Sequence, residues 1–180
     1  LHHPDVAKIE TILSDCEQLG CRILTPEDEE YPENLRNIYA MPAVLFVLGS
    51  LQFINEASLS VAMVGTRRCS STGLHIAWNI AHDLAASGAA VVSGLAMGID
   101  ASCHLGAIAG KGKTIAVMPC GLETISPPEN EYLWHKVIQN GGAVISECPP
   151  NMAIDWKRTY HSRNRLISGL AQGVVLVEGR

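Results

Sequence analysis

The sequence predicts an α/β fold: a Rossmann-like, doubly wound and mostly parallel sheet with flanking helices and a short N-terminal helical and irregular extension. From residue 60 onward, short runs that are apolar throughout alternate with longer segments whose apolar residues recur at helical spacing. Strands that are apolar on both faces are typical of parallel sheets covered by helices. The right-handed crossover rule then gives the doubly wound arrangement.

The extension occupies residues 1–57. Residues 5–20 have apolar side chains close to helical spacing and end in Gly20, which predicts a helix. Residues 25–42 are acidic and interrupted by prolines, so we expect a loop with short helical turns. The run AVLFVLG, residues 43–49, predicts a short buried strand.

The Rossmann-like domain occupies residues 58–180. Its apolar runs predict strands at residues 60–66, 89–96, 114–119, 143–147 and 173–179. The periodic segments between them predict helices at residues 72–88, 98–110, 129–141 and 162–172. Gly88 and Gly141 end two of these helices, a common place for glycine.

The charge of the chain is unevenly distributed. The net charge is −5, from 13 basic and 18 acidic residues, which argues against a general binder of polyanions. Residues 1–60 contain three of the basic and ten of the acidic residues, which leaves ten basic and eight acidic ones for residues 61–180. A local basic site can therefore exist within an acidic chain.

Cysteine spacing and hydropathy exclude several classes of protein. The six cysteines form no C-x-x-C pair, so we expect no metal site and a reducing cytoplasmic environment. No apolar run has the length of a membrane span, and the N-terminus lacks the charged-then-apolar pattern of a signal peptide. We therefore expect a cytoplasmic protein that does not contact membranes.

Ligands of doubly wound sheets bind beyond the carboxyl ends of the strands, so the loops there are the candidate site. The turn GTRRCSSTG after the first parallel strand lacks the glycine spacing of a dinucleotide-binding turn, and SGLAMGID after the second lacks it too. We therefore predict no cofactor. The residues of interest at this edge are Arg67, Arg68, Ser93, Gly94, Gly98, Asp100, Glu147 and the segment from Lys157 to Arg165.

Arg67 and Arg68 follow the first parallel strand and favour a phosphate ligand. A helix N-terminus near residues 72–73 adds partial positive charge at the same place. The alternative is that both arginines pair with a nearby carboxylate such as Glu147.

A second basic cluster lies between the last two predicted strands. Trp156 and Tyr160 lie among its cations and offer faces on which nucleic-acid bases could stack. The cations are Lys157, Arg158, Arg163 and Arg165.

Four stretches together resemble the DNA-processing protein A family (DprA/Smf): VGTRRCSSTG, SGLAMGIDASCHLGAIAGKGKTIAVMPCGLE, SRNRLISGL and the upstream YPENLRNIYAMPAVLFVLG. The resemblance runs from about residue 25 to the end of the chain. It implies a cytoplasmic bacterial protein of Rossmann-like fold that binds single-stranded DNA and has no established catalytic activity. It further implies a recombination mediator of natural transformation in competent cells, which protects incoming DNA and helps to load the RecA recombinase in the presence of single-strand-binding protein.

The resemblance also implies roles for individual residues. Arg67 matches an arginine that contacts DNA phosphate, and Lys157 and Tyr160 match a lysine and an aromatic residue of the same pocket. With the other members of the motifs and of the basic clusters, the predicted DNA-binding set is Arg67, Arg68, Ser93, Gly94, Gly98, Lys157, Tyr160, Arg163 and Arg165. The residues expected to order the loops are Asp100, Glu147 and Asn164.

The chain departs from the family pattern in three places. Ser126-Pro127 replaces a Tyr-Pro pair, and Tyr160-His161 replaces a Phe-Pro pair. In the second pair, tyrosine keeps a stacking face, and the loss of the proline is expected to loosen the loop. The chain stops at Arg180, whereas family members continue with elements that complete the sheet and carry self-association. We therefore expect a domain that is incomplete at its C-terminal end, and homodimer formation is left open.

Two other classes of function stay open at this point. One is a nucleotide-binding or nucleotide-hydrolysing Rossmann-like enzyme that uses Asp100, His104 and Glu147 as acid and base groups. The P-G-G-x-G-T-x-x-E signature of related enzymes that cleave nucleotide glycosidic bonds is absent from the sequence. For Asp100 we favour a structural role at a helix start, with a hydrogen bond to His104 one turn along. The other class is an interaction scaffold whose acidic segment 27–33 binds a basic partner.

Overall fold

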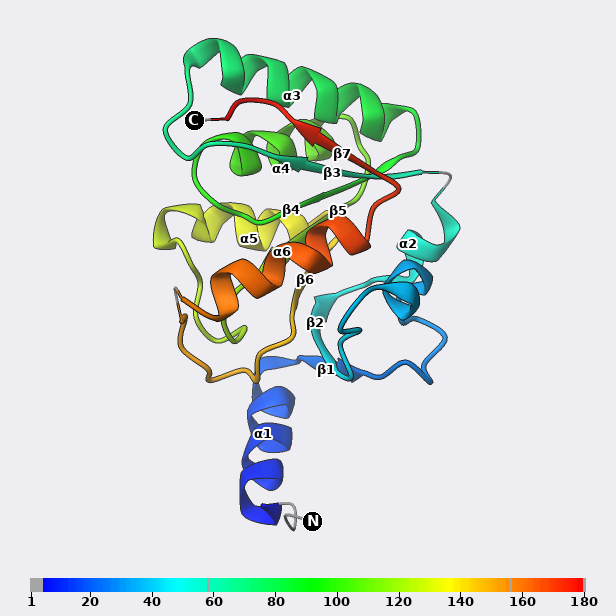
Figure 1. Cartoon of the computed structure of the whole chain (residues 1–180), viewed down its shortest axis with the longest axis vertical. Coiled ribbons are helices and arrows are strands. Elements are labelled where there is room, and N and C mark those ends of the chain that lie inside the picture. Colours follow the sequence, from blue (N-terminus) through cyan, green and yellow to red (C-terminus); the bar gives the residue numbers. More distant parts are fainter. Residues whose placement is uncertain (1–4, 58, 156, 180) are drawn as a thin grey trace.

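A seven-stranded mixed sheet with helices on both faces forms the core of the chain (Figure 1). The computed structural model describes residues 5–57, 59–155 and 157–179, except the side chain of Tyr160, and the elements named here lie within these residues. The strands are β1 (Arg22–Leu24), β2 (Leu45–Gly49), β3 (Ser60–Val64), β4 (Ala90–Ser93), β5 (Thr114–Met118), β6 (Ala143–Ser146) and β7 (Gly173–Leu176). The helices are α1 (Val6–Leu19), η1 (Glu33–Asn37), α2 (Gln52–Glu56), α3 (Ser71–Ala86), α4 (Ile99–Ala109), η2 (Pro128–Asn130), α5 (Glu131–Gln139) and α6 (Thr159–Gly169).

The strands are ordered β1-β2-β6-β5-β4-β3-β7 across the sheet. The strands β3 to β7 pair parallel with one another, whereas β2 pairs antiparallel with β6, and β1 pairs antiparallel with β2. The chain moves from β3 through β4 and β5 to β6, and then crosses back to place β7 on the other side of β3. This reversal makes the sheet doubly wound and puts its topological switch point between β3 and β7. The predicted fold class is confirmed.

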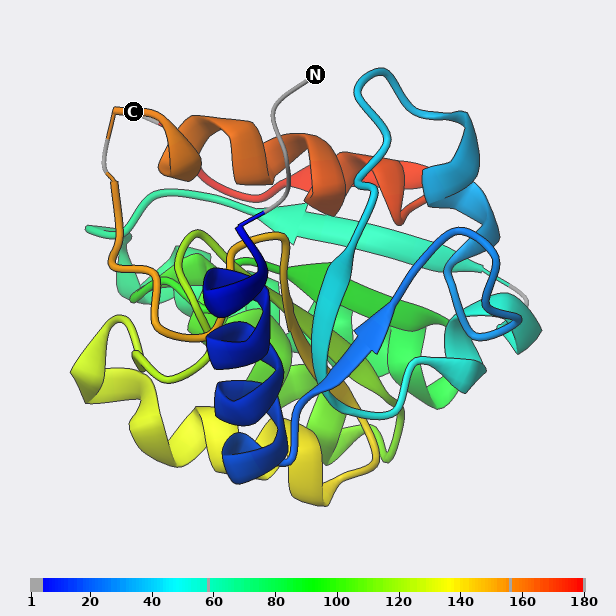
Figure 2. The same cartoon turned by 90° about the horizontal axis from the view of Figure 1, so that it is seen from below.

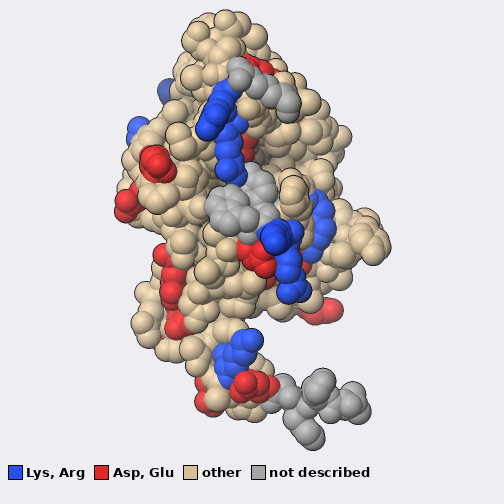
Figure 3. All heavy atoms as spheres, turned by 60° about the vertical axis from the view of Figure 1, so that its left-hand side comes forward, with Lys and Arg blue, Asp and Glu red and all other residues tan. Residues whose placement is uncertain are grey.

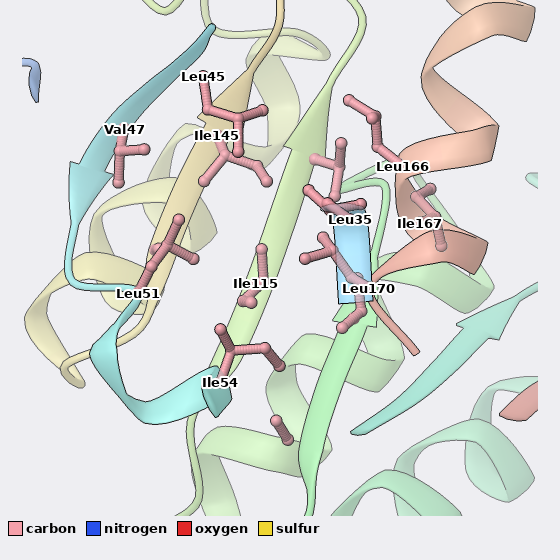
Figure 4. Close-up of a cluster of buried hydrophobic side chains, with 14 of the residues drawn as sticks. Leu35, Leu45, Val47, Leu51, Ile54, Ile115, Ile145, Leu166, Ile167 and Leu170 are labelled. Atoms are coloured by element: carbon pink, nitrogen blue, oxygen red, sulfur yellow. The ribbon is translucent and has the colours of Figure 1, made fainter. Parts of the chain in front are cut away.

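Both faces of the central strands β4, β5 and β6 are buried, as their uninterrupted apolar runs predict, whereas the edge strand β7 leaves Val174 and Leu176 exposed. On one face, α6 and η1 cover a cluster in which Leu166, Leu170 and Leu35 pack with Ile115 and Ile145 of the strands (Figure 4). On the other face, small side chains of α3 and α4 allow these helices to pack closely on the first two parallel strands. Figure 2 shows the sheet between α6 on one side and α5 on the other.

The predicted elements correspond closely to the observed ones. The five strands predicted between residues 60 and 179 are β3 to β7, and the four helices predicted between them are α3 to α6. The predicted helix at residues 5–20 is α1, which begins where the Asp5 side chain accepts from the Lys8 N–H and ends at Gly20, whose φ is 67°. The sequence pattern does not reveal β1 and α2, because three and five residues are too few for a periodic signal.

The boundary predicted at residue 57 stays a prediction. Both β1 and β2 lie before it in the chain, yet they extend the sheet beyond β6. Helix α1 projects from the sheet at the same side (Figures 1 and 2).

The described residues lack a membrane-spanning helix and a metal-binding cluster. Among residues 5–57, 59–155 and 157–179, no helix has the length and hydrophobicity that crossing a membrane requires. The same residues contain no group of three His, Cys, Asp or Glu side chains placed to hold a metal ion. The cysteines are all free thiols, and only Cys69 among them is not buried.

Candidate functional site

The loops after the parallel strands meet at one edge of the sheet, on the left-hand side of Figure 1, where β3 and β7 end. Figure 3 looks onto this side and shows Lys and Arg side chains gathered in an upper and a lower group. Arg67 and Arg68 are exposed in the loop between β3 and α3, and Lys157 and Arg158 are exposed just before α6. Both predicted basic clusters therefore have members on the surface of this edge.

The loop after β4 lies against the loop that carries these two arginines. Gly98 has a φ of 81°, in the left-handed region that glycine favours, and a Cβ on it would lie 2.7 Å from the carbonyl oxygens of both Thr66 and Arg67. The Ile99 N–H donates to the Thr66 carbonyl oxygen at 3.4 Å. The glycine is therefore required for the close backbone contact that supports Arg67.

Asp100 orders the loop after β4 from inside the molecule. It is 6% exposed, and its Oδ2 accepts a hydrogen bond from the Gly94 N–H at 3.2 Å. Burial raises the pKa of Asp100, and the nearby Arg163 guanidinium opposes that rise. Leu95 is fully buried at a φ of 58°, and its carbonyl oxygen accepts from Asn130 Nδ2 at 2.8 Å. These buried contacts hold the loop in one conformation.

Arg163 of α6 is buried rather than displayed to solvent. The residue is 4% exposed, and its Nη1 donates to the carbonyl oxygens of Gly94, at 2.9 Å, and of Val117. Its Nε donates to Asn164 Oδ1 at 3.3 Å. Arg163 therefore ties α6 to the carboxyl ends of β4 and β5, and it is satisfied by protein groups.

A narrow, mostly apolar slot opens beside Arg67. Met97, which is 47% exposed, together with Pro127 and Ile154, gives the slot its apolar surface. The residues that line it are Arg67, Gly94, Ala96, Met97, Pro119, Ser126, Pro127, Ile154 and Arg163. Arg163 also lines a larger cavity of about 450 Å³ between α6 and the strands β3 and β7.

Asp155 shapes the segment that enters α6. Its Oδ1 accepts from the backbone N–H groups of Lys157, at 2.9 Å, and Arg158, at 3.1 Å. This turn leaves the side chains of both basic residues exposed. Trp156 and the side chain of Tyr160, the two predicted stacking faces, lie outside the described residues.

Glu147 pairs with Arg165 across the loop between β6 and α6. Nη2 of Arg165 donates to both carboxylate oxygens, at 2.5 and 2.6 Å, and about a third or less of each side chain is exposed. Among the described residues, the ion pair of Glu147 is with Arg165 and not with Arg67 or Arg68, so the alternative that names Glu147 as their partner is wrong.

Ser93 and Asn164 differ in exposure. Ser93 is fully buried, and its Oγ donates to the Met63 carbonyl oxygen at 2.6 Å, which joins the ends of β4 and β3 below the surface. Asn164 is exposed on α6. The predicted site residues thus separate into surface cations and a buried layer that holds the loops.

The three residues of the enzyme alternative do not meet. His104 is fully buried, and its Nδ1 lies 2.7 Å from Oγ1 of Thr114, the first residue of β5 and therefore at the opposite edge of the sheet. The expected hydrogen bond between Asp100 and His104 is wrong, because Asp100 accepts from Gly94 and the ring of His104 turns to the buried hydroxyl. Glu147 is engaged in its ion pair.

Glu178, just after β7, is a site residue that the sequence analysis does not single out. Its carboxylate accepts from the Ser70 N–H at 3.1 and 3.2 Å and from Ser70 Oγ at 2.8 Å. The helix predicted to begin near residues 72–73 begins at Ser71, and a carboxylate of the protein lies at its N-terminus. The signal that the sequence offers is a single acidic residue, Glu178, near the end of the apolar run at residues 173–179.

Comparison with known proteins points to one family. Residues 22–180 match the family model described as DNA recombination-mediator protein A. The chain is 37% identical over 173 residues to protein Smf of Escherichia coli (strain K12), which covers 94% of this chain and 45% of that protein. It is 33% identical over 173 residues to DNA processing protein DprA of Bacillus subtilis (strain 168), which covers 96% of this chain and 57% of that protein. The chain spans about half the length of the curated relatives it matches.

Two solved structures have a similar fold. The X-ray structure of DNA processing protein A from Streptococcus pneumoniae superposes with a TM-score of 0.82 at 32% identity, over 96% of this chain and 58% of that one. DNA processing protein A from Helicobacter pylori, whose structure is described by its single-stranded DNA binding mode, superposes with a TM-score of 0.76 at 28% identity. That match covers 86% of this chain and 68% of the other.

Proposed function

The chain belongs to the DNA recombination-mediator protein A family, and we propose that it binds single-stranded DNA at the carboxyl edge of its sheet as part of DNA processing in recombination. Relatives named for DNA processing, and the Helicobacter pylori structure described by its single-stranded DNA binding, support this proposal. The observation that carries it is an apolar slot lined by Arg67, at an edge where Arg68 and Lys157 are also exposed.

The exposed cations neutralise the phosphate backbone in this proposal. Arg67, Arg68 and Lys157 can each approach a phosphodiester from solvent, and each such contact releases counterions from the strand. Affinity therefore falls with salt. Contacts to phosphates carry no sequence information, so we expect little preference among base sequences.

In this proposal, the slot makes the chain bind single-stranded DNA in preference to double-stranded DNA. Met97 and Ile154 offer apolar surface against which an unpaired base can lie, and Tyr160 is proposed as a stacking face from its match to the family motif. Paired DNA keeps its bases stacked inside the helix, so only an unpaired base can enter the slot.

The members of the predicted set that contact other protein groups instead of solvent have a positioning role in this proposal. They bond to protein groups and hold the loops that carry the cations. These residues are Ser93, Gly94, Gly98, Asp100 and Arg163. Glu147 holds Arg165, and Asn164 accepts from Arg163.

The biological setting is proposed from family membership alone. In this setting, the protein protects incoming single strands and helps to load RecA in the presence of single-strand-binding protein. Both activities take place in the cytoplasm of cells undergoing natural transformation. The chain spans about half of its curated relatives, so RecA contact and self-association are proposed for the whole family proteins. The residues of this edge support the contact with single-stranded DNA.

We propose binding without catalysis. The candidate acid and base groups Asp100, His104 and Glu147 are dispersed, and the first two are buried. A reaction that needs an acid and a base near one substrate atom requires groups within hydrogen-bond reach of it.

The direct experiment is fluorescence anisotropy of a labelled oligothymidylate. We expect the chain to bind the oligonucleotide, and the double variant Arg67→Ala, Lys157→Ala to lose measurable binding. The double variant Lys111→Ala, Lys113→Ala removes the same charge from the segment before β5, at the opposite edge, and should bind like the unaltered chain. Equal affinity of the two double variants would overturn the proposal.

A further inference from the structure

The N-terminus of α3 lies at the switch point between β3 and β7, where doubly wound sheets commonly bind ligand phosphates. In this chain, hydrogen bonding between the two strands continues past their ends. The Val177 N–H donates to the Val64 carbonyl oxygen at 3.1 Å, and the Thr66 N–H donates to the Glu178 carbonyl oxygen at 2.8 Å. This pairing carries Glu178 to the loop that precedes α3.

The Glu178 carboxylate takes up donors that a phosphate would otherwise use. It accepts from both the N–H and the Oγ of Ser70, the N-cap of α3. The Ser70 Oγ in turn accepts from the Gly73 N–H at 2.9 Å. A Cβ on Gly73 would overlap Oε2 of Glu178, so the glycine makes the room that the carboxylate occupies. The positive end of the helix is thus neutralised from within the protein.

We propose that Glu178 is a specificity-determining residue that excludes phosphate monoesters and pyrophosphates, such as those of free nucleotides, from the α3 N-terminus. A monoester carries close to two negative charges at neutral pH and a diester carries one, so the carboxylate repels the monoester more strongly. The edge then accepts a diester backbone that passes over Arg67 and Arg68. Only this last step rests on the proposed function, since the exclusion concerns the helix terminus itself.

Calorimetric titration with inorganic pyrophosphate tests the exclusion. Glu178→Gln keeps the size of the side chain and an oxygen that can accept from Ser70, and it removes the charge. We expect this variant to bind pyrophosphate about tenfold more tightly than the unaltered chain. Glu123→Gln changes the net charge equally at an exposed position after β5 and should bind no more tightly than the unaltered chain.

Thermal unfolding with and without pyrophosphate gives a second readout for a variant that folds poorly. An anion that fills the vacated position binds the folded state and raises the unfolding temperature. We expect this rise for Glu178→Gln and for Glu178→Ala, and none for Glu123→Gln. If neither Glu178 variant gains affinity or thermal stability from pyrophosphate, the proposal is overturned.

Oligothymidylate binding by the same variants separates this inference from the proposed function. We expect Glu178→Gln to change oligothymidylate affinity by less than about threefold, because the strand is held by the arginines outside the helix terminus. Absence of oligothymidylate binding by the unaltered chain would remove the proposed function and leave the pyrophosphate result standing. A gain of oligothymidylate affinity as large as that for pyrophosphate would contradict the selectivity assigned to Glu178.

Discussion

The guanidinium of Arg163 packs directly against Gly94. Its Nη1 donates to the Gly94 carbonyl oxygen at 2.9 Å, and a Cβ on the glycine would lie 2.5 Å from the same nitrogen. Arg163 belongs to α6, which follows Lys157, and Gly94 begins the loop that supports Arg67. This one contact therefore joins the helix of the second basic cluster to the loop that supports the first.

Replacing Gly94 by alanine should push Arg163 away from the ends of β4 and β5. We expect Gly94→Ala to lower the free energy of unfolding by about 1–3 kcal/mol, as overpacking of a buried site does, and to weaken oligothymidylate binding. Urea unfolding and anisotropy measure the two effects. Gly173→Ala places the same methyl group where nothing lies within 4 Å and should behave like the unaltered chain. An unchanged free energy for Gly94→Ala would mean that Arg163 moves aside at no cost.

Arg163 should affect DNA binding without contacting phosphate. Arg163→Met leaves buried carbonyl oxygens of Gly94 and Val117 without this donor, at a cost of about 1–3 kcal/mol for each unsatisfied group. We expect lower oligothymidylate affinity with an unchanged dependence of affinity on salt. A salt dependence reduced as much as in Arg67→Ala would show that Arg163 itself meets the strand.

His104 should make the stability of the fold sensitive to acid. Burial lowers the pKa of His104 from 6.5 to about 3, and its Nε2 has no hydrogen-bond partner among the described residues. Below about pH 6.5 the unfolded chain binds a proton that the folded chain does not, so stability falls as the pH drops toward 3, by up to about 1.4 kcal/mol per pH unit from this residue.

His104→Asn tests this assignment, because it removes the titrating ring and keeps a donor for Thr114 Oγ1. The Thr114 hydroxyl donates to the Val91 carbonyl oxygen at 2.7 Å, so it needs a donor from position 104. We expect urea unfolding between about pH 7 and 5 to show a flatter pH dependence for the variant. The same slope in both proteins would contradict a neutral buried imidazole.

Glu147 should contribute little to stability and nothing essential to binding. Its ion pair with Arg165 is partly exposed, so Glu147→Gln should change the free energy of unfolding by less than about 1 kcal/mol. Oligothymidylate affinity should stay equal or rise, because one negative charge leaves the edge. A loss of binding greater than about tenfold would assign Glu147 a direct role that the proposed function does not include.

The parallel strands and their helices could be predicted from the sequence because each is long enough to show its period. The position of Arg67 and Lys157 at the carboxyl edge of the sheet also followed from the sequence, because both lie in loops that follow parallel strands. The burial of Arg163 did not, because it depends on two carbonyl groups that are 69 and 46 residues away in the chain. Nothing in the local pattern distinguishes this arginine from its neighbour Arg165.

The position of Glu178 depends on strand order, which local sequence does not specify. Only when β7 lies beside β3 does a residue after the last strand meet Ser70 at the start of α3. The five apolar runs are compatible with other orders of strands. The acidic residue after β7 therefore acquires its role from the topology.

The salt dependence of oligothymidylate affinity tests the central claim most directly. The three exposed cations of the predicted DNA-binding set, Arg67, Arg68 and Lys157, should give a slope of log affinity against log salt of about −2, with about 0.7 contributed by each phosphate contact of a single strand. Arg67→Ala should reduce that slope by about 0.7. A slope near zero for the unaltered chain, or a slope that Arg67→Ala leaves unchanged, would contradict phosphate binding at this edge.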